Sequence, residues 1–404
     1  MCGIAGFCNF KEDFEENTDY WNFRLEKMRA VLAHRGNDAR GRFLKKHIGL
    51  SHSRLAIRDI LCGDQPMTRT HNGYEYTICY NGEIYNTDEL IPELSENGFV
   101  CSTTSDTEVI LYSYIHWGAD FVSHLNGIFA FAIWDAAKNR LLLYRDRVGV
   151  KPLFYAIRGD SLVFGSEPKA CFAHPAVKPE LDKQGLQELL AIGPAHTSGL
   201  SLFKDLFEVL PGHFMIYSRD GLHDETYWEL TSSEHTESYR DTVAHTRFLV
   251  EDAIKRQMVS DVPVCTFLSG GIDSSIVTAI AANYMNTRGK TLNTFSFDFK
   301  DNDRYFKAND FQPERDLPYV NRMLEEYETA HSYLECDENS LFKALFAAVD
   351  AKDMPGMTDV DSSLLYFCSL VSRKNKVALT GECADEIFGG YPWFYRKELL
   401  ERYG

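Results

Sequence analysis

Hydrophobic and polar positions follow two different patterns along the chain. From residue 48 to 165, short runs rich in aromatic and β-branched residues are broken by Gly, Asn and Asp, which is typical of antiparallel strands and turns. Apolar residues recur at three- and four-residue spacing over 19–33 and 106–117, and this spacing predicts two helices. We therefore expect the first half of the chain to form sheets packed against helices.

The second half of the chain alternates helical and strand patterns. In order, the patterns predict a helix over 240–259, an apolar strand over 262–268, a helix over 273–286, and strands over 291–298 and 376–380. Such alternation indicates an α/β domain with a mainly parallel sheet, whose ligands lie at the carboxyl ends of the strands. Residues 229–240 are polar and aperiodic, as in a linker. We expect one domain over 2–228, a linker over 229–240 and a second domain over 241–404.

Composition narrows the class of protein. The chain has 404 residues, 44% of them hydrophobic and 25% charged, as in globular proteins of two or three domains. A formal net charge of −17 argues against a broad phosphate-binding surface, so we expect no nucleic-acid partner. The chain has no apolar run long enough for a membrane span, and charged residues such as Lys11 and Glu12 replace the apolar segment of a signal peptide. The ten cysteines form no CxxC pair, which fits a reducing cytoplasm.

Cys2 directly follows Met1 in the opening stretch MCGIAGF. Removal of Met1 would leave a thiol and a free α-amine on one residue, and so a nucleophile that carries its own base. An α-amino pKa near ~8 suits proton transfer near neutral pH. The other cysteines are interpreted as small core residues.

The stretch VPVCTFLSGGIDSS leads from a predicted buried strand through a Ser/Gly turn into a helix. Its backbone N–H groups and the helix N-terminus would form a cradle for an anion. The residues that could hold phosphate oxygens are Ser269, Gly270, Gly271, Ser274 and Ser275. The loop has no lysine at the P-loop position and has Asp273 instead, which makes sense if this carboxylate holds Mg²⁺ beside the phosphates. The alternative is an ordinary glycine turn with a helix N-cap.

The stretch ALTGECADEIFGGY places acidic residues after another predicted strand. Its carboxylates on Glu382, Asp385 and Glu386 would face the same sheet edge as Asp273. Taken alone, this stretch could be a solvated acidic turn. Together with SGGIDSS it predicts a metal and nucleotide site.

A series of motifs in one order resembles a known family. The motifs are MCGIAG, AHRGNDARG, SHSRLAI, NGEIYN, SDTEVI, GIFAFAIWD, RDRVGVKPLFY, FGSEPKA, SGGIDSS and TGECADEIFGGY. Together they look like the glutamine-dependent asparagine synthetases, over nearly the whole chain. The resemblance implies an α+β N-terminal-nucleophile glutaminase, built as an αββα sandwich, followed by an α/β ATP-pyrophosphatase-type domain.

The resemblance also implies the chemistry of the first domain. Cys2 would attack the side-chain amide of glutamine, release ammonia and leave a γ-glutamyl thioester for water to cleave, with the α-amine as proton shuttle. The glutamine contacts it implies are Arg54 to the α-carboxylate, Asp106 to the ammonium, Asn81 and Gly82 as the oxyanion hole, and Glu83 to the substrate or the Cys2 amine. From spacing alone, Arg54 and Asp106 could be solvated surface charges and NGE a hairpin turn.

For the second domain, the resemblance implies that ATP and aspartate form β-aspartyl-AMP and pyrophosphate, after which ammonia displaces AMP. It implies that the SGGIDSS loop holds the pyrophosphate, that Asp273 and Asp385 hold Mg²⁺, and that Glu382 takes part in forming the adenylate. The further nucleotide contacts that it implies are Leu268, Phe297, Thr380 and Gly381. The expected small-molecule substrates are thus glutamine, aspartate and ATP.

The chain departs from the family pattern at two places. Asn37 stands in AHRGND where the family usually has proline, and the chain stops soon after GGY, where family members continue with a largely helical stretch. We therefore expect the second domain to be incomplete at its C-terminus. Two alternatives stay open: an amidotransferase acting on another carboxylate, and a glutaminase-only protein with an inactive second half. The sequence does not fix the oligomeric state, and a homodimer is one candidate.

Overall fold

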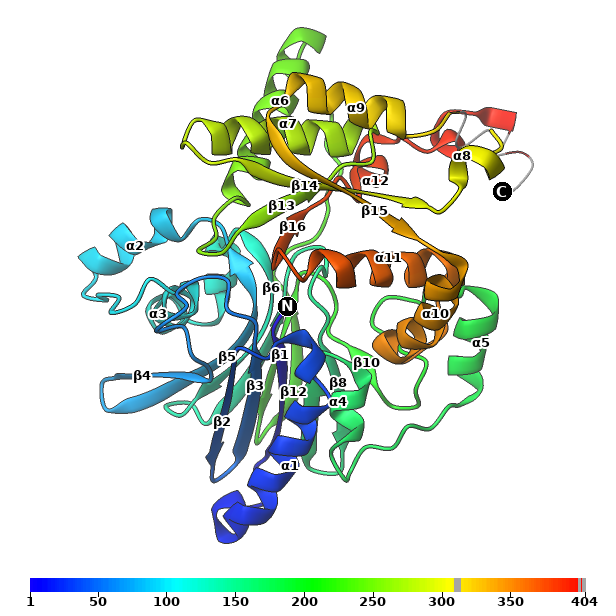
Figure 1. Cartoon of the computed structure of the whole chain (residues 1–404). Helices are drawn as coiled ribbons and strands as arrows, with labels where there is room; N and C mark the ends of the chain where they lie inside the picture. Colours follow the sequence, from blue (N-terminus) through cyan, green and yellow to red (C-terminus); the bar gives the residue numbers. More distant parts are fainter. Residues whose placement is uncertain (309–313, 399–400, 402–404) are drawn as a thin grey trace. The chain divides into compact units, whose positions relative to one another are not determined.

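The computed structural model describes residues 1–308, 314–398 and 401, and the chain divides into two compact units (Figure 1). The first unit comprises Met1–Glu234 and Val349–Met357, and the second comprises His235–Ala348 and Thr358–Gly404. The stretch Val349–Met357 belongs to the first unit because Lys169 binds it, with Nζ 2.6 Å from the carbonyl of Asp350. The sequence analysis did not anticipate this inserted stretch, and its expected domain bounds stay a prediction.

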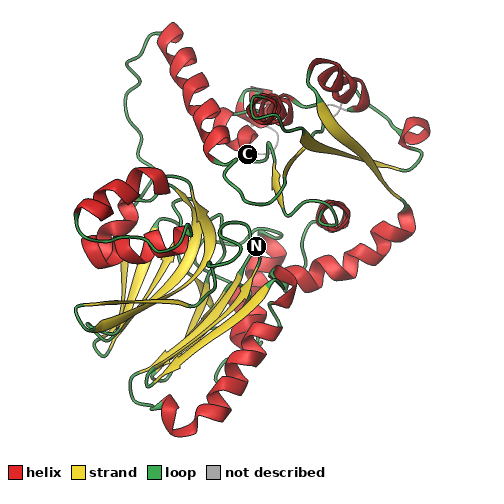
Figure 2. Ribbon diagram, turned by 60° about the vertical axis from the view of Figure 1, so that its left-hand side comes forward, coloured by secondary structure: helices red, strands yellow, loops and turns green. Residues whose placement is uncertain are grey.

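The first unit contains two six-stranded antiparallel sheets, which lie face to face (Figure 2). The first sheet consists, in spatial order, of β10 (Phe207–Glu208), β8 (Phe154–Arg158), β9 (Ser161–Gly165), β1 (Gly3–Asn9), β3 (Ile48–Arg54) and β2 (Ala39–Lys45). The second consists of β12 (Gly221–Thr226), β11 (His213–Ser218), β7 (Arg140–Arg145), β6 (Gly127–Asp135), β5 (Tyr74–Ile84) and β4 (Met67–His71).

Helices cover the outer face of each sheet. The first sheet carries α1 (Thr18–Ala30) and α4 (Pro168–Phe172), and the second carries α2 (Thr87–Glu96) and α3 (Asp106–Trp117). The remaining helices of this unit are α5 (Lys183–Ala191) and the short 3₁₀ helices η1 (Phe14–Asn17), η2 (Ala33–Arg35) and η3 (Ala119–His124). The result is the αββα sandwich expected from the sequence.

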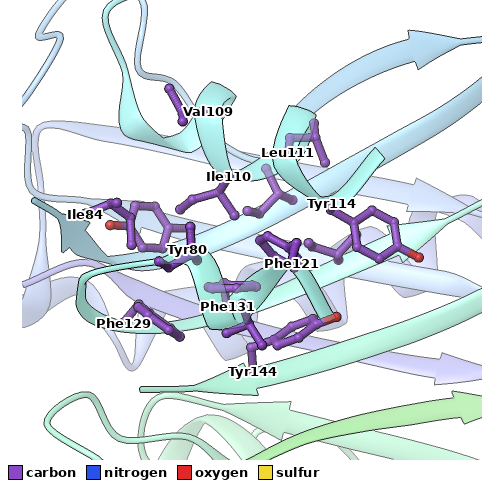
Figure 3. Packing of buried hydrophobic residues seen from close by; sticks show 14 of the residues in the cluster. Tyr80, Ile84, Val109, Ile110, Leu111, Tyr114, Phe121, Phe129, Phe131 and Tyr144 are labelled. Carbon is purple, nitrogen blue, oxygen red and sulfur yellow. The ribbon is translucent and has the colours of Figure 1, made fainter. Parts of the chain in front are cut away.

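Strand β6 shows why its sequence forms a central strand of the sandwich. Alternate side chains of GIFAFAIWD point to opposite faces, as the period of a strand requires. Phe129 and Phe131 pack with residues of α3 in one core cluster (Figure 3), whereas Ala130 and Ala132 pack between the two sheets. Each buried Phe contributes roughly 1.5–3 kcal/mol of burial free energy, so the bulky positions fix which face meets the helices.

The second unit is built on one four-stranded parallel sheet, as the alternating pattern predicts. Its strands, in spatial order, are β15 (Thr329–Cys336), β14 (Leu292–Phe299), β13 (Val264–Phe267) and β16 (Val377–Leu379). The helices of the second half of the chain are α6 (Tyr239–Arg256), α7 (Ile272–Asn286), α8 (Asn302–Tyr305), α9 (Leu317–Glu326), α10 (Glu338–Lys352), α11 (Thr358–Val371), α12 (Ala384–Phe388) and the 3₁₀ helix η4 (Pro392–Phe394).

Two details of the second half differ from the sequence expectations. Strand β15 was not expected, because it is an edge strand of mixed polarity, TAHSYLEC, whose side chains are mostly only half buried. Helix α6 begins at Tyr239, where the hydroxyl of Ser238 accepts the N–H of Asp241, so the last residues of the expected linker are helical. Within the part of the chain that the structure describes, no helix has the length and apolar character of a membrane span.

Candidate functional site

Cys2 stands directly before strand β1, at one end of the first sheet. Along β1, Ile4 and Cys8 pack between the two sheets, whereas Ala5 and Phe7 pack toward α1. On a strand, side chains an even number of residues apart point to the same face. Cys2 is an even number of residues from Ile4 and Cys8, so its side chain is directed to the side of the second sheet. The cysteine that follows Met1 in the sequence therefore lies at the end of the core between the two sheets.

The thiol of Cys2 contacts the backbone of the chain that leaves strand β3. The N–H of Leu55 lies 3.4 Å from Cys2 Sγ, and Sγ lies 3.6 Å from the carbonyl oxygen of Leu55. Burial raises the pKa of the Cys2 thiol, and the Leu55 N–H, which favours the thiolate, opposes that shift. Burial also lowers the pKa of the Met1 α-amine to about 5. In this structure the α-amine belongs to Met1, so Cys2 would carry its own base only after Met1 is removed.

Asn81 lies on β5, on the strand face that meets the first sheet. Cys79, two residues earlier on the same face, belongs to the inter-sheet core. The Asn81 side chain is only 1% exposed, and within the described residues its amide Nδ2 has no hydrogen-bond partner. A buried amide donor without a partner is costly unless something binds there, so this atom is suited to an oxyanion.

Gly82 follows Asn81 inside the strand and is paired with Phe129 of β6. A Cβ atom added at Gly82 would lie 2.3 Å from the carbonyl oxygen of Ile128, so only glycine fits the close approach of β6. The NGE sequence is therefore part of strand β5, and the hairpin-turn interpretation is wrong. Glu83, two residues beyond Asn81 along the strand, is half buried and has the same parity as Asn81.

Asp106 begins helix α3 and points to the end of β5. Its Oδ2 accepts hydrogen bonds from the Tyr80 hydroxyl (2.9 Å) and from the N–H of Ile84 (3.0 Å), and it lies 3.9 Å from Nη1 of Arg58. Asp106 is 5% exposed, and burial raises the pKa of its carboxyl. It is a positioned, buried acid, so the interpretation as a solvated surface charge is wrong for it.

Arg54 is equally buried and already has partners. Its guanidinium donates to the carbonyl oxygens of Arg58 (3.3 Å), Asp59 (2.5 Å) and Ile60 (3.1 Å). Its fourth partner is Asp64, 3.0 Å away, whose side chain is 74% exposed. The solvated-charge interpretation is therefore wrong for Arg54 too. Its guanidinium holds the loop after β3, and Asp64 is the one partner that is itself a solvent-exposed carboxylate.

In the second unit, the two motifs that sequence analysis paired meet at one sheet edge. Strands β13 and β16 are adjacent and parallel, so the loops that follow them lie at the same edge. A Cβ atom added at Gly381 would lie 2.7 Å from the backbone nitrogen of Ser274 and 2.8 Å from Asp273. The absence of a side chain at Gly381 thus lets the TGE loop pack against the first turn of α7.

The SGGIDSS loop has the local features of an anion cradle. Gly270 has a φ of +87°, which glycine adopts without strain, and no side chain caps helix α7 at Gly271. The hydroxyls of Ser269 and Ser274 lie 3.0 Å apart, and the hydroxyl of Ser274 also donates to the carbonyl of Gly271 (3.1 Å). Ser275 is half buried in the first turn of the helix. The N-terminal turn of α7 has no side-chain cap that an anion would have to displace.

The expected nucleotide residues line two separate hollows of the second unit. A small cavity of about 160 Å³ is lined by Leu268, Ser269 and Phe297, among others. A larger groove of about 1560 Å³ is lined by Asp273, Thr380, Gly381 and Glu382 together with apolar side chains of α6 and α7. The structure therefore brings these residues to one sheet edge but not into one pocket.

The expected metal ligands Asp273 and Asp385 lie in the segments that follow two neighbouring strands. Across residues 1–308, 314–398 and 401, no three or more His, Cys, Asp or Glu side chains gather as a metal site. Mg²⁺ in phosphate sites commonly takes one or two protein carboxylates and completes its coordination with phosphate oxygens and water. The donor set therefore fits a cation that arrives with a nucleotide.

Sequence reasoning missed three residues that contact or surround Cys2. The backbone of Leu55 contacts Sγ, Arg35 Nε donates to the Cys2 carbonyl oxygen (2.8 Å), and Lys151 is buried near the N-terminus. Arg35 lies inside the motif AHRGND and Lys151 inside VGVKPLF. A basic residue within a family motif is therefore the sequence signal that could have found both. The contact made by Leu55 depends on its backbone and has no sequence signal.

Comparisons with known proteins agree with this division of the chain. A family model for a glutamine amidotransferase domain matches residues 1–228, and one for asparagine synthase matches residues 245–404. Over 400 residues the chain is 48% identical to asparagine synthetase (glutamine-hydrolyzing) 3 of Bacillus subtilis strain 168, which covers 99% of this chain and 64% of that relative. It is 32% identical over 419 residues to a Methanocaldococcus jannaschii protein provisionally named asparagine synthetase (glutamine-hydrolyzing) 2, covering 97% of this chain and 76% of the relative.

Among solved structures, the chain matches the glutamine phosphoribosylpyrophosphate amidotransferase of B. subtilis. It has a TM-score of 0.43 and 16% sequence identity, with 98% of each chain covered. The amidotransferase family model matches the two-sheet sandwich that follows Cys2. The protein is therefore in the class of glutamine amidotransferases. More narrowly, the chain belongs to the family of glutamine-hydrolysing asparagine synthetases. It spans 64% of the length of its B. subtilis relative.

Proposed function

We propose that this protein takes part in glutamine-dependent asparagine synthesis, with glutamine hydrolysis in the first unit and ATP-dependent activation of aspartate in the second. The observation that carries the first half is the placement of Cys2 and Asn81 on the strand faces that meet the inter-sheet core. Both residues have the strand parity that faces the inter-sheet core, and Asn81 Nδ2 is buried without a partner among the described residues. The second half is supported by the asparagine synthase match over residues 245–404.

In the first reaction, Met1 is removed and the α-amine of Cys2 accepts the thiol proton. The Cys2 thiolate then attacks the side-chain carbonyl carbon of glutamine, and the resulting oxyanion accepts hydrogen bonds from Asn81 Nδ2 and the N–H of Gly82. Collapse of this intermediate breaks the C–N bond, and the amine returns its proton to the departing nitrogen, which leaves as ammonia. Water hydrolyses the thioester to glutamate and regenerates Cys2.

Substrate binding in the first unit uses groups that are already positioned. The glutamine α-carboxylate replaces the Asp64 carboxylate at Arg54, because Asp64 is the solvent-exposed partner of that guanidinium. The substrate ammonium pairs with Asp106, and Glu83 holds the substrate or the Cys2 amine. Burial makes each of these contacts stronger than it would be at a surface.

In the second reaction, the aspartate β-carboxylate attacks the α-phosphorus of ATP, forming β-aspartyl-AMP and releasing pyrophosphate. Ammonia then displaces AMP to give asparagine. We assign phosphate binding to the first turn of α7 and the SGGIDSS loop, and nucleotide contacts to Leu268, Phe297 and the TGE loop. Glu382 assists formation of the adenylate. Asp273 and Asp385 would hold Mg²⁺, which neutralises phosphate charge when bound.

The cellular setting is part of the same proposal. A cytoplasmic location supplies glutamine, aspartate and ATP together, and the net charge of −17 disfavours a nucleic-acid partner. A homodimer is one candidate assembly, which light scattering would check.

The test measures four products from one reaction mixture of the purified chain with ATP, Mg²⁺, aspartate and glutamine: glutamate, ammonia, AMP and asparagine. We expect all four, and we expect Cys2→Ala to abolish the glutamine-supported reaction while ammonia still supports AMP and asparagine formation. The matched control is Cys62→Ser: the exposed Cys62 lies in the loop that Arg54 holds but bonds Asp59 through its backbone N–H, which serine keeps, so all four products stay unchanged.

Three results would contradict parts of the proposal. Glutamate without AMP would mean that the second half does not activate aspartate in this chain. If AMP formed only when a different carboxylate was supplied, that carboxylate would replace aspartate as the substrate. Glutamine hydrolysis that survives Cys2→Ala would remove Cys2 from the mechanism altogether.

A further inference from the structure

Lys151 is a buried lysine beside the N-terminus that the proposed reaction does not use. Its side chain is 9% exposed, and its Nζ lies 3.3 Å from Sδ of Met1. A thioether sulfur is a weak, uncharged acceptor, so this contact does not neutralise the ammonium group. Nη2 of Arg35 lies 3.9 Å from the same sulfur. The Met1 side chain thus covers two cationic groups, which its removal would uncover.

The fold fixes the position of Lys151 through the carboxylate of Asp146. This carboxylate accepts the backbone N–H groups of Val150 and Lys151, both at 2.9 Å, and of Phe129 at 3.1 Å. Phe129 stands opposite Gly82 in the pairing of β6 with β5. The loop that carries Lys151 is therefore attached to the strand that supports the expected oxyanion residues, and it has little freedom to move away.

The backbone carbonyl groups of Lys151 and Gly149 also accept hydrogen bonds that fix this turn. Nε of Arg145 donates to the Lys151 carbonyl oxygen (3.0 Å), and Nη2 of Arg145 donates to the carbonyl oxygen of Gly149 (3.1 Å). Gly149 has a φ of +70°, a conformation that glycine supplies without strain. The backbone of Lys151 is thus anchored on both sides, and its side chain is buried.

Charged groups from several elements face the Lys151 ammonium. They are the positive Arg35 and the α-amine, which this structure places on Met1 and which removal of Met1 would place on Cys2, and the negative groups Glu83, Asp146 and the Cys2 thiolate. Burial is the main cause that lowers the pKa of both Lys151 and the α-amine, and in each case nearby positive charge lowers it further. Between buried groups such repulsion is weakly screened by salt.

We propose that Lys151 is a positioning residue of the nucleophile, whose ammonium charge keeps the neighbouring α-amine unprotonated and so ready to accept the thiol proton. The inference rests on the proposed use of the Cys2 amine as a base. It requires only that Lys151 stays charged when the amine is neutral, and a lysine side chain holds its proton more strongly than an α-amine does. Lys151 needs no contact with glutamine for this role.

The test replaces Lys151 by methionine, which keeps the length and the apolar stem and removes the charge. The α-amine is titrated directly by the pH dependence of its carbamylation by cyanate, because only the neutral amine reacts, with the modified N-terminal peptide counted by mass spectrometry. We expect the midpoint to rise by about one pH unit in Lys151→Met. We expect Lys151→Arg, which keeps the charge, to restore the wild-type midpoint.

Glutamine hydrolysis provides a second readout. The acidic limb of the kcat/KM profile should move to higher pH by the same amount in Lys151→Met, with the high-pH plateau changed by less than about threefold. A uniform loss across all pH values with an unchanged amine midpoint would overturn the inference, because it would indicate a structural role. Lys138→Met is the matched control, since Lys138 is exposed on the β6–β7 turn. Intact mass measured first confirms that Met1 is removed equally in every variant.

The two readouts separate this inference from the proposed function. If the wild type hydrolyses no glutamine but the amine midpoint still rises in Lys151→Met, the proposed function fails, whereas the effect of the Lys151 charge on the amine stands. If glutamine is hydrolysed and the midpoint does not move, the proposed function stands and the inference fails.

Discussion

The candidate sites of the two units are prepared to different degrees. In the first unit, Arg54, Asn81 and Asp106 are all at most 5% exposed, and Arg54 and Asp106 already have named hydrogen-bond partners. In the second unit, Ser269 and Glu382 are exposed, and an apolar groove of about 1560 Å³ runs beside the TGE loop. The first site is preorganised by the core around it, whereas the second depends on what binds to it.

This difference follows from the architecture. The first site lies at the end of a closed two-sheet sandwich, where side chains of both sheets and of α3 surround it. The second site lies on loops at the edge of a four-stranded sheet, where only backbone groups and helix ends are fixed. A buried site stabilises charge by fixed dipoles, and an open one gains its order when a ligand arrives.

The largest effect should come from Asn81→Ala in the preorganised site. Loss of an oxyanion donor raises the barrier by about 3–4 kcal/mol, so kcat for glutamine hydrolysis should fall about 10²–10³-fold while synthesis from ammonia is retained. Asn97→Ala, at an exposed position that ends α2, is the control. Equal losses of both reactions would show that Asn81 supports the fold of the chain and not the glutamine reaction.

A smaller effect on stability is expected at Glu108, which anchors the loop before α3. Its carboxylate is fully buried and accepts hydrogen bonds from Arg69 Nε, the backbone N–H groups of Ser102 and Thr103, and both of their hydroxyls. Although burial alone would raise it, these hydrogen bonds lower the pKa of Glu108 from 4.5 to about 2. Glu108→Gln should lower the free energy of unfolding by about 2–3 kcal/mol at neutral pH.

The sign of the pH dependence follows from that lowered pKa. The unfolded chain binds the Glu108 proton first as the pH falls, so the stabilisation is complete above about pH 4.5 and is lost between about pH 4.5 and pH 2. Melting temperatures of the wild type and Glu108→Gln, followed by near-ultraviolet circular dichroism, should converge over that range. Glu75→Gln, at a half-exposed carboxylate, should match the wild type throughout. If the melting temperatures of the wild type and Glu108→Gln stayed equally far apart at every pH, the lowered pKa of Glu108 would not be the source of the stabilisation.

The smallest effect is expected from Gly381→Ala in the open site. The added Cβ would approach the Ser274 nitrogen at 2.7 Å, so the TGE loop must shift away from the first turn of α7. We expect ATP affinity to weaken about tenfold, a change of about 1.4 kcal/mol, with glutamine hydrolysis unchanged. Ala347→Ser is the control, because Ala347 is exposed on α10 and lines neither hollow. Unaltered ATP binding in isothermal calorimetry would show that the packing of Gly381 is unimportant for the nucleotide.

Much of the fold was readable because long patterns reflect local geometry. The alternation in GIFAFAIWD and the helical spacing in DTEVILYSYIHW predicted β6 and α3, since both segments bury one face against a large core. Strand β15 escaped prediction because an edge strand with half-exposed side chains lacks that alternation. The assignment of Val349–Met357 to the first unit also escaped, because it depends on the contacts that Lys169 makes far away in the sequence.

The candidate site divides in the same way. The family motifs, the strand–turn–helix context of SGGIDSS and the cysteine behind Met1 could be read from the amino-acid order, because each of these is a property of neighbouring residues. The folded chain was needed to show that Asn81 Nδ2 is buried without a partner among the described residues, that Arg54 is engaged by its own loop, and that Lys151 lies beside the N-terminus. Burial and charge proximity arise when strands distant in sequence pack together, and no local pattern records which of them will meet.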